Sequence, residues 1–548
     1  MRRPGRAVQG LLGAAALIAV VTVVSRVLGL VRLLVQSGTV GADEIADAYN
    51  AANVLPNILF EAAAGGALAG AVVPLLAGPV AGADREQVSR ITSAALGWAL
   101  TVLVPVGVLL ALASGVVADV ATDDPATAAM VRYLVLVFSV QVPLYGVAVL
   151  LYGVLQAHHR FFWPAFAPVL NSLVVITAYT VYGVMADGEV RDPTGLPAGA
   201  VDVLAWGTTA GVAAMCLPML VPVRRLGVRL RPTWRFPAGT GPRFRALALA
   251  GVGAVAAQQL SVAVVWALAN SRLPGEGQGY TAFLYAQQVY LLPYAVLVVP
   301  LATSTFPRIA AHVAAADRTR LAALSAVTTR AVLAAAVLGA AAVLAGGPAV
   351  ATVFAAFAEQ PGVVGAMGST LDWMAPGVVG LAVLFHVSRT LYALERSRSA
   401  VAVNACGWLV VALTAVVLVA RADADGVLAA LGQATTVGMA AGAVAAVMAL
   451  RRAVGGAALA GLPRTVVVSV AGAALGAPLG RWVAGTVLDL TGHGAVSATG
   501  AAAGGAVVAA AVVAAAVVLA DRSTLQAVAA GGSSAGAPAA GPSAPAGR

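Results

Sequence analysis

The sequence predicts an all-α polytopic membrane protein with about fourteen transmembrane helices. Three observations predict this class: the composition, a series of apolar runs long enough to cross a bilayer, and an alternation of charge between the connecting loops. Of the 548 residues, 60% are hydrophobic and only 10% are charged, and the mean hydropathy is +0.92. Soluble domains have about 25% charged residues, so this composition excludes a soluble globular protein.

The apolar runs define the expected spans, because a helix needs about 20 apolar residues to cross the hydrocarbon core of a bilayer. Fourteen runs meet this length. They lie near residues 10–36, 46–79, 89–117, 129–156, 163–185, 200–223, 244–270, 280–307, 325–357, 371–394, 400–420, 427–450, 465–488 and 497–520.

The charges of the connecting loops test this count, since cytoplasmic loops collect basic residues and the opposite loops do not. Arginines or histidines lie before the first run and after every even-numbered run up to the twelfth, whereas the intervening loops carry mostly Asp and Glu. The alternation predicts both termini in the cytoplasm. It also explains the net charge of +10 as membrane topology, so no nucleic-acid partner is expected.

The domain organisation follows from the basic segment in the middle of the chain, which divides the runs into two sets of six and a final pair. Two similar bundles around a central cavity are a common plan of transporters. The tail is rich in Gly, Ala, Ser and Pro and is expected to be disordered. We therefore predict an N-terminal bundle at 1–223, a basic cytoplasmic linker at 224–243, a C-terminal bundle at 244–450, a helix pair at 465–520 and a disordered cytoplasmic tail at 521–548.

Polar residues form one stripe on the expected helix at 46–79. At about 100° per residue they share an arc of about 120°. Ionisable groups at bilayer depth normally face a bundle interior or a hydrated cavity, so the stripe indicates an enclosed cavity. The alternative for its amides is hydrogen bonding between helices, or to carbonyls freed by Pro56. The stripe consists of Asp47, Asn50, Asn53, Asn57 and Glu61.

Two arginines lie inside the first apolar run, at positions 26 and 32. The guanidinium group of Arg is always charged and matches the geometry of a phosphate or carboxylate, so Arg26 and Arg32 are candidate ligand residues. Alternatively, Arg32 reaches the outer interface and Arg26 pairs with an acid such as Glu61. Gly29 allows the bend that would direct both arginines to one site.

The later runs contain fewer polar candidates. Gln288 could hydrogen-bond a sugar or peptide, or simply join two helices. His386 and Arg389 lie near the cytoplasmic end of their run, where surface or interface roles are expected.

The chain contains none of the common enzyme signatures: no GxSxG nucleophile elbow, no HExxH, no P-loop and no Cys or His cluster with the spacing of metal ligands. Its two cysteines, Cys216 and Cys406, lie in apolar runs and are expected to be packing residues. We therefore expect neither an enzyme nor a bound cofactor or metal.

Several segments resemble the MurJ (MviN) family of lipid II flippases, in its actinobacterial form. The resemblance implies the fold of the MOP exporter superfamily, which is MATE-like, with two pseudo-symmetric six-helix bundles and a C-terminal helix pair. The segments are SRVLGLVR at 25–32, ADAYNAANVLPNILFEAAAGGALAGAVVPLL at 46–76, GVLQAHHRFFWPAFAPVLNS at 153–172, FLYAQQVYLLP at 283–293, PLATSTFPRIAAH at 300–312 and SRTLYALERSRS at 388–399.

The resemblance implies a function and roles for the residues. A flippase of this family moves lipid II, an undecaprenyl-pyrophosphate-linked peptidoglycan precursor, from the inner to the outer leaflet by alternating access. Arg26 and Arg32 match the two functional arginines of the family's first helix, and would hold the pyrophosphate. Asp47 matches the acid that begins the second helix. The pair at 465–520 would line a groove for the lipid tail.

The remaining roles are hypotheses that combine this resemblance with the residue types. Asn53, Asn57 and Gln288 would contact the sugar or peptide. Asp47 and Glu61 would respond to a coupling cation, to a proton or to Arg26. The expected location is the bacterial cytoplasmic membrane, and the expected partners are lipid II, membrane lipids, and proteins of cell-wall synthesis and division.

The chain also departs from the family pattern at three positions where many members carry a charge. Phe60 and Glu61 stand in place of paired arginines, Gly65 in place of a glutamate, and Gln288 in place of an arginine. Two alternatives therefore stay open: an exporter of another polyprenyl-linked glycan, and a transport-inactive scaffold of the cell-wall synthesis machinery.

Overall fold

The computed structural model describes residues 4–63, 69–189, 192–272, 279–358 and 362–521. Helices make up nearly all of this described part, which contains no β-strand. The helices of the first half are α1 (Pro4–Thr39), α2 (Glu44–Glu61), α3 (Ala69–Ala81), α4 (Arg85–Leu112), α5 (Ser114–Ala121), α6 (Pro125–Ser139), α7 (Gln141–Ala157), α8 (Phe162–Ala186), α9 (Ala200–Cys216) and α10 (Leu220–Arg225), with short 3-10 turns at Pro193–Gly195 and Leu217–Met219.

The second half begins with a long helix that follows the basic linker. Its helices are α11 (Thr240–Arg272), α12 (Tyr280–Pro293), α13 (Val299–Ala314), α14 (Arg318–Ala358), α15 (Gly362–Met374), α16 (Gly377–Ala393), α17 (Ser397–Val419), α18 (Val427–Val454), α19 (Leu462–Thr491) and α20 (Ala495–Ala520), with a π-helical turn at Tyr294–Val298 and 3-10 turns at Ala424–Gly426 and Gly456–Leu459.

The expected membrane helices are present. Ten helices of the described residues are long and apolar enough to cross a membrane, or up to twelve if each of two bent pairs is one span. The all-helical membrane fold is therefore confirmed, and the count of fourteen stays a prediction. The expected run at 46–79 contains α2 and α3, and residues 64–68 between them lie outside the described part of the chain.

Two expected spans are interrupted in ways that the periodicity did not show. The run at 371–394 begins earlier, with α15, which meets α16 at an angle of 47°. Pro376 lies at this bend, and its missing N–H removes a helical hydrogen bond. In the run at 280–307, a π-helical turn at Tyr294–Val298 separates α12 from α13, between Pro293 and Pro300. Such turns often mark functional sites.

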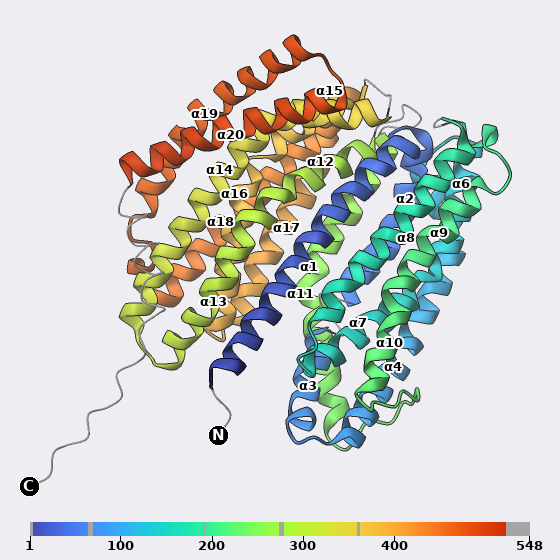
Figure 1. The fold of residues 1–548 in the computed structure, drawn as a ribbon, viewed down its shortest axis with the longest axis vertical. Helices are drawn as coiled ribbons and strands as arrows, with labels where there is room; N and C mark the ends of the chain where they lie inside the picture. The colour runs from blue at the N-terminus through green and yellow to red at the C-terminus, as the bar shows by residue number, and fades with distance from the viewer. Residues whose placement is uncertain (1–3, 64–68, 190–191, 273–278, 359–361, 522–548) are drawn as a thin grey trace, which may run out of the picture.

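The helices form two groups that lie side by side (Figure 1). In this view α6 to α10 lie on one side and α14 to α20 on the other, with α1 and α11 between them. Both central helices contact helices from the two halves of the chain: α1 packs on α8 and α14, and α11 packs on α3 and α17. The final pair, α19 and α20, packs on α14.

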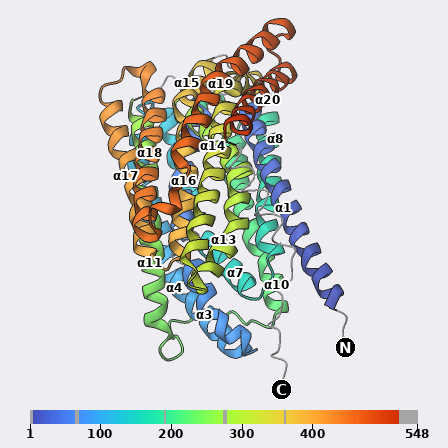
Figure 2. The same cartoon turned by 90° about the vertical axis from the view of Figure 1, so that its left-hand side faces the viewer.

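The loop charges separate onto the two ends of the molecule. The N-terminus, the connection from α3 to α4 and the basic linker lie at one end, which we call the arginine-rich end (Figures 1 and 2). The connections from α8 to α9 and from α19 to α20 lie at the opposite end, which we call the acidic end. This arrangement agrees with the alternation in the sequence.

Glycines set the close packing of the later helices. A Cβ on Gly480 of α19 would lie 2.3 Å from the carbonyl oxygen of Gly505 in α20, so only glycine fits there. A Cβ on Gly438 of α18 would meet the backbone of α17 at Val411 and Gly407 within 2.8 Å. Small residues let membrane helices approach in this way, where no hydrophobic force drives their association.

Candidate functional site

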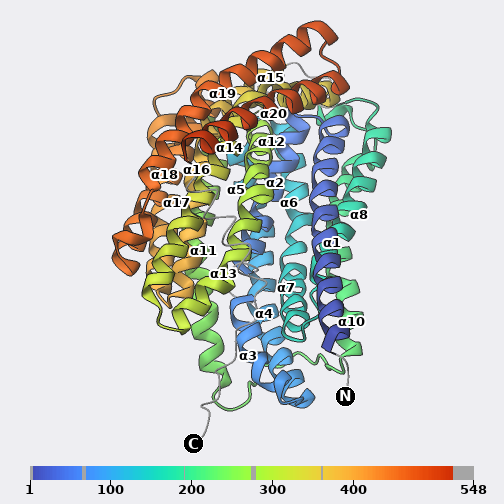
Figure 3. The same cartoon turned by 60° about the vertical axis from the view of Figure 1, so that its left-hand side comes forward.

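Three helices from the two halves, α1, α2 and α12, meet at the acidic end (Figure 3). Polar side chains join them there. The amide nitrogen of Gln36 in α1 donates to the Oδ1 atom of Asn50 in α2, at 3.0 Å. The amide nitrogen of Asn50 donates to the hydroxyl of Thr281 in α12, at 2.9 Å. All three residues are buried. Because a buried polar group without a partner is costly, this chain fixes how the three helices fit together.

Asp47 strengthens the same junction through the backbone of α12. Its two carboxylate oxygens accept the N–H groups of Gly279, at 3.1 Å, and of Thr281, at 2.8 Å. The first N–H groups of a helix have no partner within the helix, and the helix dipole places partial positive charge there. Asp47 therefore caps α12 from a different helix. The hydroxyl of Tyr285 adds a bond to the carbonyl of Gly41, at 3.0 Å.

From Asn50 onwards, exposure increases along the polar stripe towards the arginine-rich end, whereas Asp47 at the acidic end is half-buried. Asn50 is buried, Asn53 is half-buried, and Asn57 and Glu61 are exposed. On α1, Gln36 is buried, Arg32 is half-buried and Arg26 is exposed; on α12, Tyr285 is buried and Gln288 is exposed. The junction thus closes the acidic end, and the same three helices present polar groups to their surroundings at the other end.

The two arginines of α1 have different environments. Arg32 donates to the Oδ1 atom of Asn171 in α8, at 3.0 Å. It therefore points into the first group of helices. Arg26 is exposed. Within the described residues Arg26 forms no ion pair with Glu61.

The two amides in the middle of the stripe also differ. The hydroxyl of Tyr145 donates to the Oδ1 atom of Asn57, at 3.4 Å, so Asn57 does join two helices. The Oδ1 atom of Asn53 is buried and has no hydrogen-bond partner in the described part of the chain. The ring of Phe60 packs on that of Tyr145 with centroids 4.5 Å apart, where a family arginine would place a charge.

The last two candidates lie towards the arginine-rich end. Glu61 ends α2 and makes no hydrogen bond or ion pair with the described residues. Gln288 is exposed on α12, between the half-buried Gln287 and the buried Val289. Gly65, the third position where a charge is missing, lies outside the described residues.

Sequence reasoning missed several residues of this site and misjudged one other residue. The sequence analysis did not name Gln36, Asn171 or Thr281 as candidates. Asn171 could have been found, because it is a polar residue inside an apolar run, like the asparagines of α2. His386 was expected at a surface or interface, but it is 2% exposed and shares a hydrogen bond of 3.2 Å with Thr328. The position of His386 near the end of its helix did not reveal that α14 covers its side chain.

Comparison with known proteins assigns this chain to a family. A family model described as lipid II flippase MurJ matches residues 37–491, which is most of the chain. This chain belongs to the MurJ family. The family is one of transporters rather than enzymes.

Curated members of the MurJ family match about half of the chain. A probable lipid II flippase MurJ from Rhizobium meliloti (strain 1021) is 27% identical over 298 residues, covering 53% of each chain. The lipid II flippase MurJ of Burkholderia cenocepacia is 30% identical over 311 residues, covering 53% of this chain and 56% of the relative. The chain thus spans about half the length of the curated relatives it matches.

Solved structures confirm the expected MurJ and MATE-like fold. The inward closed conformation of lipid II flippase MurJ has a TM-score of 0.65 at 16% identity, covering 83% of this chain and 93% of that chain. An inward-facing MATE transporter of the MOP superfamily has a TM-score of 0.64 at 13% identity, covering 78% and 95%. The MurJ family model begins at residue 37, so the roles of Arg26 and Arg32 rest on the residues themselves and their surroundings.

Proposed function

We propose that this protein is a flippase that moves lipid II, the undecaprenyl-pyrophosphate-linked peptidoglycan precursor, from the inner to the outer leaflet by alternating access. Membership of the MurJ family supports the substrate. The observation that carries the proposal is the gradient of exposure along α1, α2 and α12, which are joined at the acidic end and present polar groups at the arginine-rich end.

The orientation follows from the positive-inside rule, which assigns the arginine-rich end to the cytoplasm. Both termini then lie in the cytoplasm, and the protein resides in the bacterial cytoplasmic membrane. In this orientation the state described is closed outward and accessible from inside. Substrate would enter from the leaflet in which a cytoplasmic precursor is made.

Charge complementarity supports the roles proposed for the first helix. The pyrophosphate of the substrate is anionic, and a guanidinium group offers it paired hydrogen bonds. Arg26 would bind it first, because that side chain is exposed. Arg32 lies six residues further towards the closed end and already donates to the amide oxygen of Asn171, so it can receive the anion by exchanging that bond.

The amides would contact the uncharged part of the headgroup. Asn53 has a buried oxygen without a partner in the described chain, and Asn57 and Gln288 are exposed. Sugar hydroxyls and peptide amides can bond to such groups. The α19 and α20 pair would hold the polyprenyl tail in the lipid phase.

The acids would control the change of state. Opening the acidic end separates α2 from α12, so the two bonds that Asp47 accepts must break. Glu61 lies exposed near the arginine-rich end and is the proposed group that responds to a coupling cation, to a proton or to Arg26.

The test is depletion of the protein followed by a leaflet-resolved assay of lipid II. We expect lipid II to accumulate in the inner leaflet, and the double variant Arg26→Ala, Arg32→Ala to fail to restore it. The matched control is Arg396→Ala, Arg398→Ala, which removes two exposed arginines at the start of α17 and should restore flipping.

Each other outcome identifies a different function. Normal outer-leaflet lipid II with another glycan missing would indicate a different polyprenyl-linked substrate. Full complementation by the Arg26→Ala, Arg32→Ala variant at normal expression would indicate a scaffold. The orientation is tested separately: a cysteine at Thr194 should react with an impermeant reagent from outside, and reaction only after permeabilisation would reverse the assignment.

A further inference from the structure

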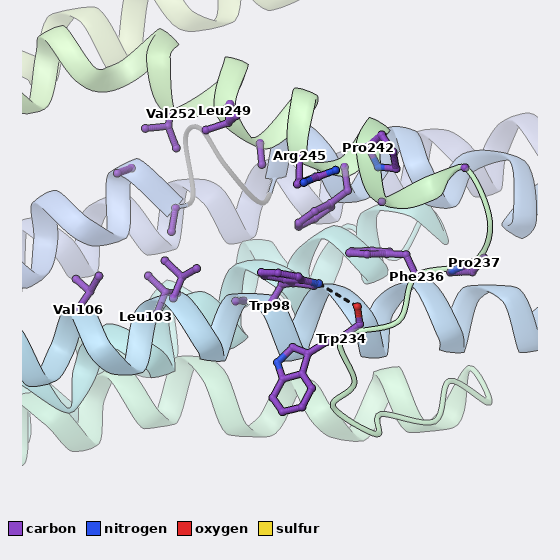
Figure 4. Close-up of a pocket in the computed structure, with 18 of the residues that line it drawn as sticks. Trp98, Leu103, Val106, Trp234, Phe236, Pro237, Pro242, Arg245, Leu249 and Val252 are labelled. Carbon is purple, nitrogen blue, oxygen red and sulfur yellow. Dashed lines mark hydrogen bonds between the residues drawn. The ribbon is translucent and has the colours of Figure 1, made fainter.

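A large apolar pocket lies away from the candidate site, between α4 and α11 at the arginine-rich end (Figure 4). Its volume is about 840 Å³, within the range of roughly 300–1,000 Å³ typical of small-molecule sites. The walls come from both halves of the chain: Leu103 and Val106 on α4, and Leu249 and Val252 on α11, with the end of α2 between them. None of the candidate substrate residues lines it.

The mouth of the pocket is formed by a strap, which we define as residues 228–236 of the linker. The strap lies on one face of α4, where residues follow at intervals of four. The hydroxyl of Ser93 donates to the carbonyl of Arg229 at 3.1 Å and accepts the N–H of Arg231 at 3.0 Å. Gly97 continues this face, and a Cβ there would lie 2.2 Å from the carbonyl oxygen of Thr233.

Two tryptophans complete the rim on the strap side. The indole of Trp98 donates to the carbonyl of Trp234 at 3.1 Å, as Figure 4 shows, and the indole of Trp234 donates to the hydroxyl of Thr101 at 2.7 Å. Their exposed fractions are 42% and 68%. Tryptophan is enriched where the hydrocarbon meets the lipid headgroups, so the rim lies at the depth of a headgroup.

The charge around the mouth has one sign. Residues 224–245 contain seven arginines and no acid, and all seven are exposed. Arg245 is the arginine that lines the pocket itself, and no acidic residue lines it. An apolar cavity with a cationic rim, placed at headgroup depth, matches a molecule with an anionic head and an apolar chain.

We propose that this pocket binds an anionic phospholipid of the surrounding leaflet, with an acyl chain between α4 and α11 and the phosphate beside Arg245. The inference does not depend on lipid II transport, since the pocket shares no residue with the proposed substrate path. Because the walls belong to α2 and α4 on one side and α11 on the other, the bound lipid contacts both halves of the protein at once.

The test is tryptophan quenching by tail-brominated lipids in vesicles of phosphatidylcholine. Brominated phosphatidylglycerol is compared with brominated phosphatidylcholine, and the signal of the pocket is the difference between the natural protein and the double variant Trp98→Phe, Trp234→Phe. Brominated phosphatidylglycerol should reach half of its maximal quenching at about one fifth of the mole fraction that brominated phosphatidylcholine needs. This factor of about five is the one expected for the attraction between one arginine and an anionic headgroup.

Matched variants locate the effect. Arg245→Gln should remove the preference for phosphatidylglycerol, whereas Arg243→Gln, on an exposed neighbour outside the pocket lining, should keep it. Val102→Phe, at a lining residue that is 54% exposed, should fill the pocket and reduce quenching by both lipids. Val104→Phe, on the same helix at 45% exposure and outside the lining, should have no effect.

Three results would overturn the proposal. Equal quenching by the two lipids in the natural protein would mean ordinary contact with the bilayer. Equal loss in Arg243→Gln and Arg245→Gln would mean a general attraction to the basic linker. Displacement of the quencher by undecaprenyl pyrophosphate, but not by unbrominated phosphatidylglycerol, would assign the pocket to a polyprenyl lipid instead.

Discussion

Asp47→Ala should open the acidic end of the molecule. In the natural protein both oxygens of this carboxylate accept backbone N–H groups of α12, at 3.1 and 2.8 Å, and these bonds join the two halves. Alanine removes both acceptors and the negative charge that faces the helix dipole. The buried contacts within each half are unchanged, so the protein should remain folded.

The size of the effect follows from the number and kind of bonds. A hydrogen bond to a charged group contributes about 1.5–3 kcal/mol. Water can reach the two N–H groups once the halves separate, so the net cost for the closed state is about 2–3 kcal/mol rather than twice the single-bond value. At about 1.4 kcal/mol per tenfold, the equilibrium between closed and open outer ends should shift roughly 30- to 150-fold.

Electron spin resonance distances across the acidic end measure this equilibrium. Spin labels at Thr194→Cys and Asp425→Cys, both exposed and in opposite halves, report the separation after Cys216 and Cys406 are replaced by serine. In Asp47→Ala a longer distance should become populated where the natural protein shows a single shorter one.

The matched control is Asp124→Ala. Its carboxylate also caps a helix at the acidic end, by accepting the N–H of Thr127 at 2.7 Å, and this bond lowers the pKa of the Asp124 carboxyl. The cap lies within one half, so its loss should not change the distance between halves. An unchanged distance distribution in Asp47→Ala, or the same change in both variants, would refute the role of Asp47 in the gate.

Three other substitutions test the packing. Gly97→Val should push Thr233, and with it the strap, away from α4 by overpacking that costs about 1–3 kcal/mol, seen as roughly tenfold faster tryptic cleavage in the strap. Asn50→Leu should lower the free energy of unfolding by about 1–3 kcal/mol in a denaturant titration, because buried polar partners lose their bonds. Arg481 and Asp372, which form three hydrogen bonds between α19 and α15, should show a coupling of about 1 kcal/mol in a double-mutant cycle.

Controls for these substitutions lie nearby in the chain. Gly115→Ala is the control for Gly97→Val. A Cβ at position 115 meets no atom within 4 Å, so this variant should leave the rate of tryptic cleavage in the strap unchanged. Asn53→Leu removes an amide whose oxygen has no partner in the described residues, so it should cost less than Asn50→Leu. Equal costs for the two Asn variants would mean that the chain of bonds through Asn50 does not stabilise the junction.

The sequence predicted the helical membrane fold because composition and loop charge are properties of long segments. The apolar runs and the alternating arginines predicted membrane-spanning helices, of which ten to twelve are present in the described residues, while the count of fourteen and the division of the chain by a linker at 224–243 stay predictions. The π-helical turn at Tyr294–Val298 and the bend between α15 and α16 were not foreseen. Proline shows where a helix can break, but the packing of neighbouring helices decides whether and how it does.

The polar stripe of α2 was predicted as a set, yet its members proved unequal. The position of each residue along the helix determines whether its side chain meets another helix. Asp47 and Asn50 bond to α12, Asn57 bonds to α7, and the Glu61 side chain makes no hydrogen bond or ion pair with the described residues. A single sequence contains helical periodicity but not the distance between helices, so partners such as Thr281 and Asn171 could not be inferred.

The strap determines where the two halves can pivot. The indole of Trp234 is hydrogen-bonded to α4, and α11 begins at Thr240, so the five residues 235–239 connect these two helices, with a reach of roughly 20 Å when fully extended. Pro237 shortens the reach of this connection, because its ring fixes the backbone angle φ. The distance between α4 and α11 on this side of the molecule must therefore stay nearly constant when the two halves move. The widest swing belongs to the far flank, where α1 carries its arginines (Figure 2).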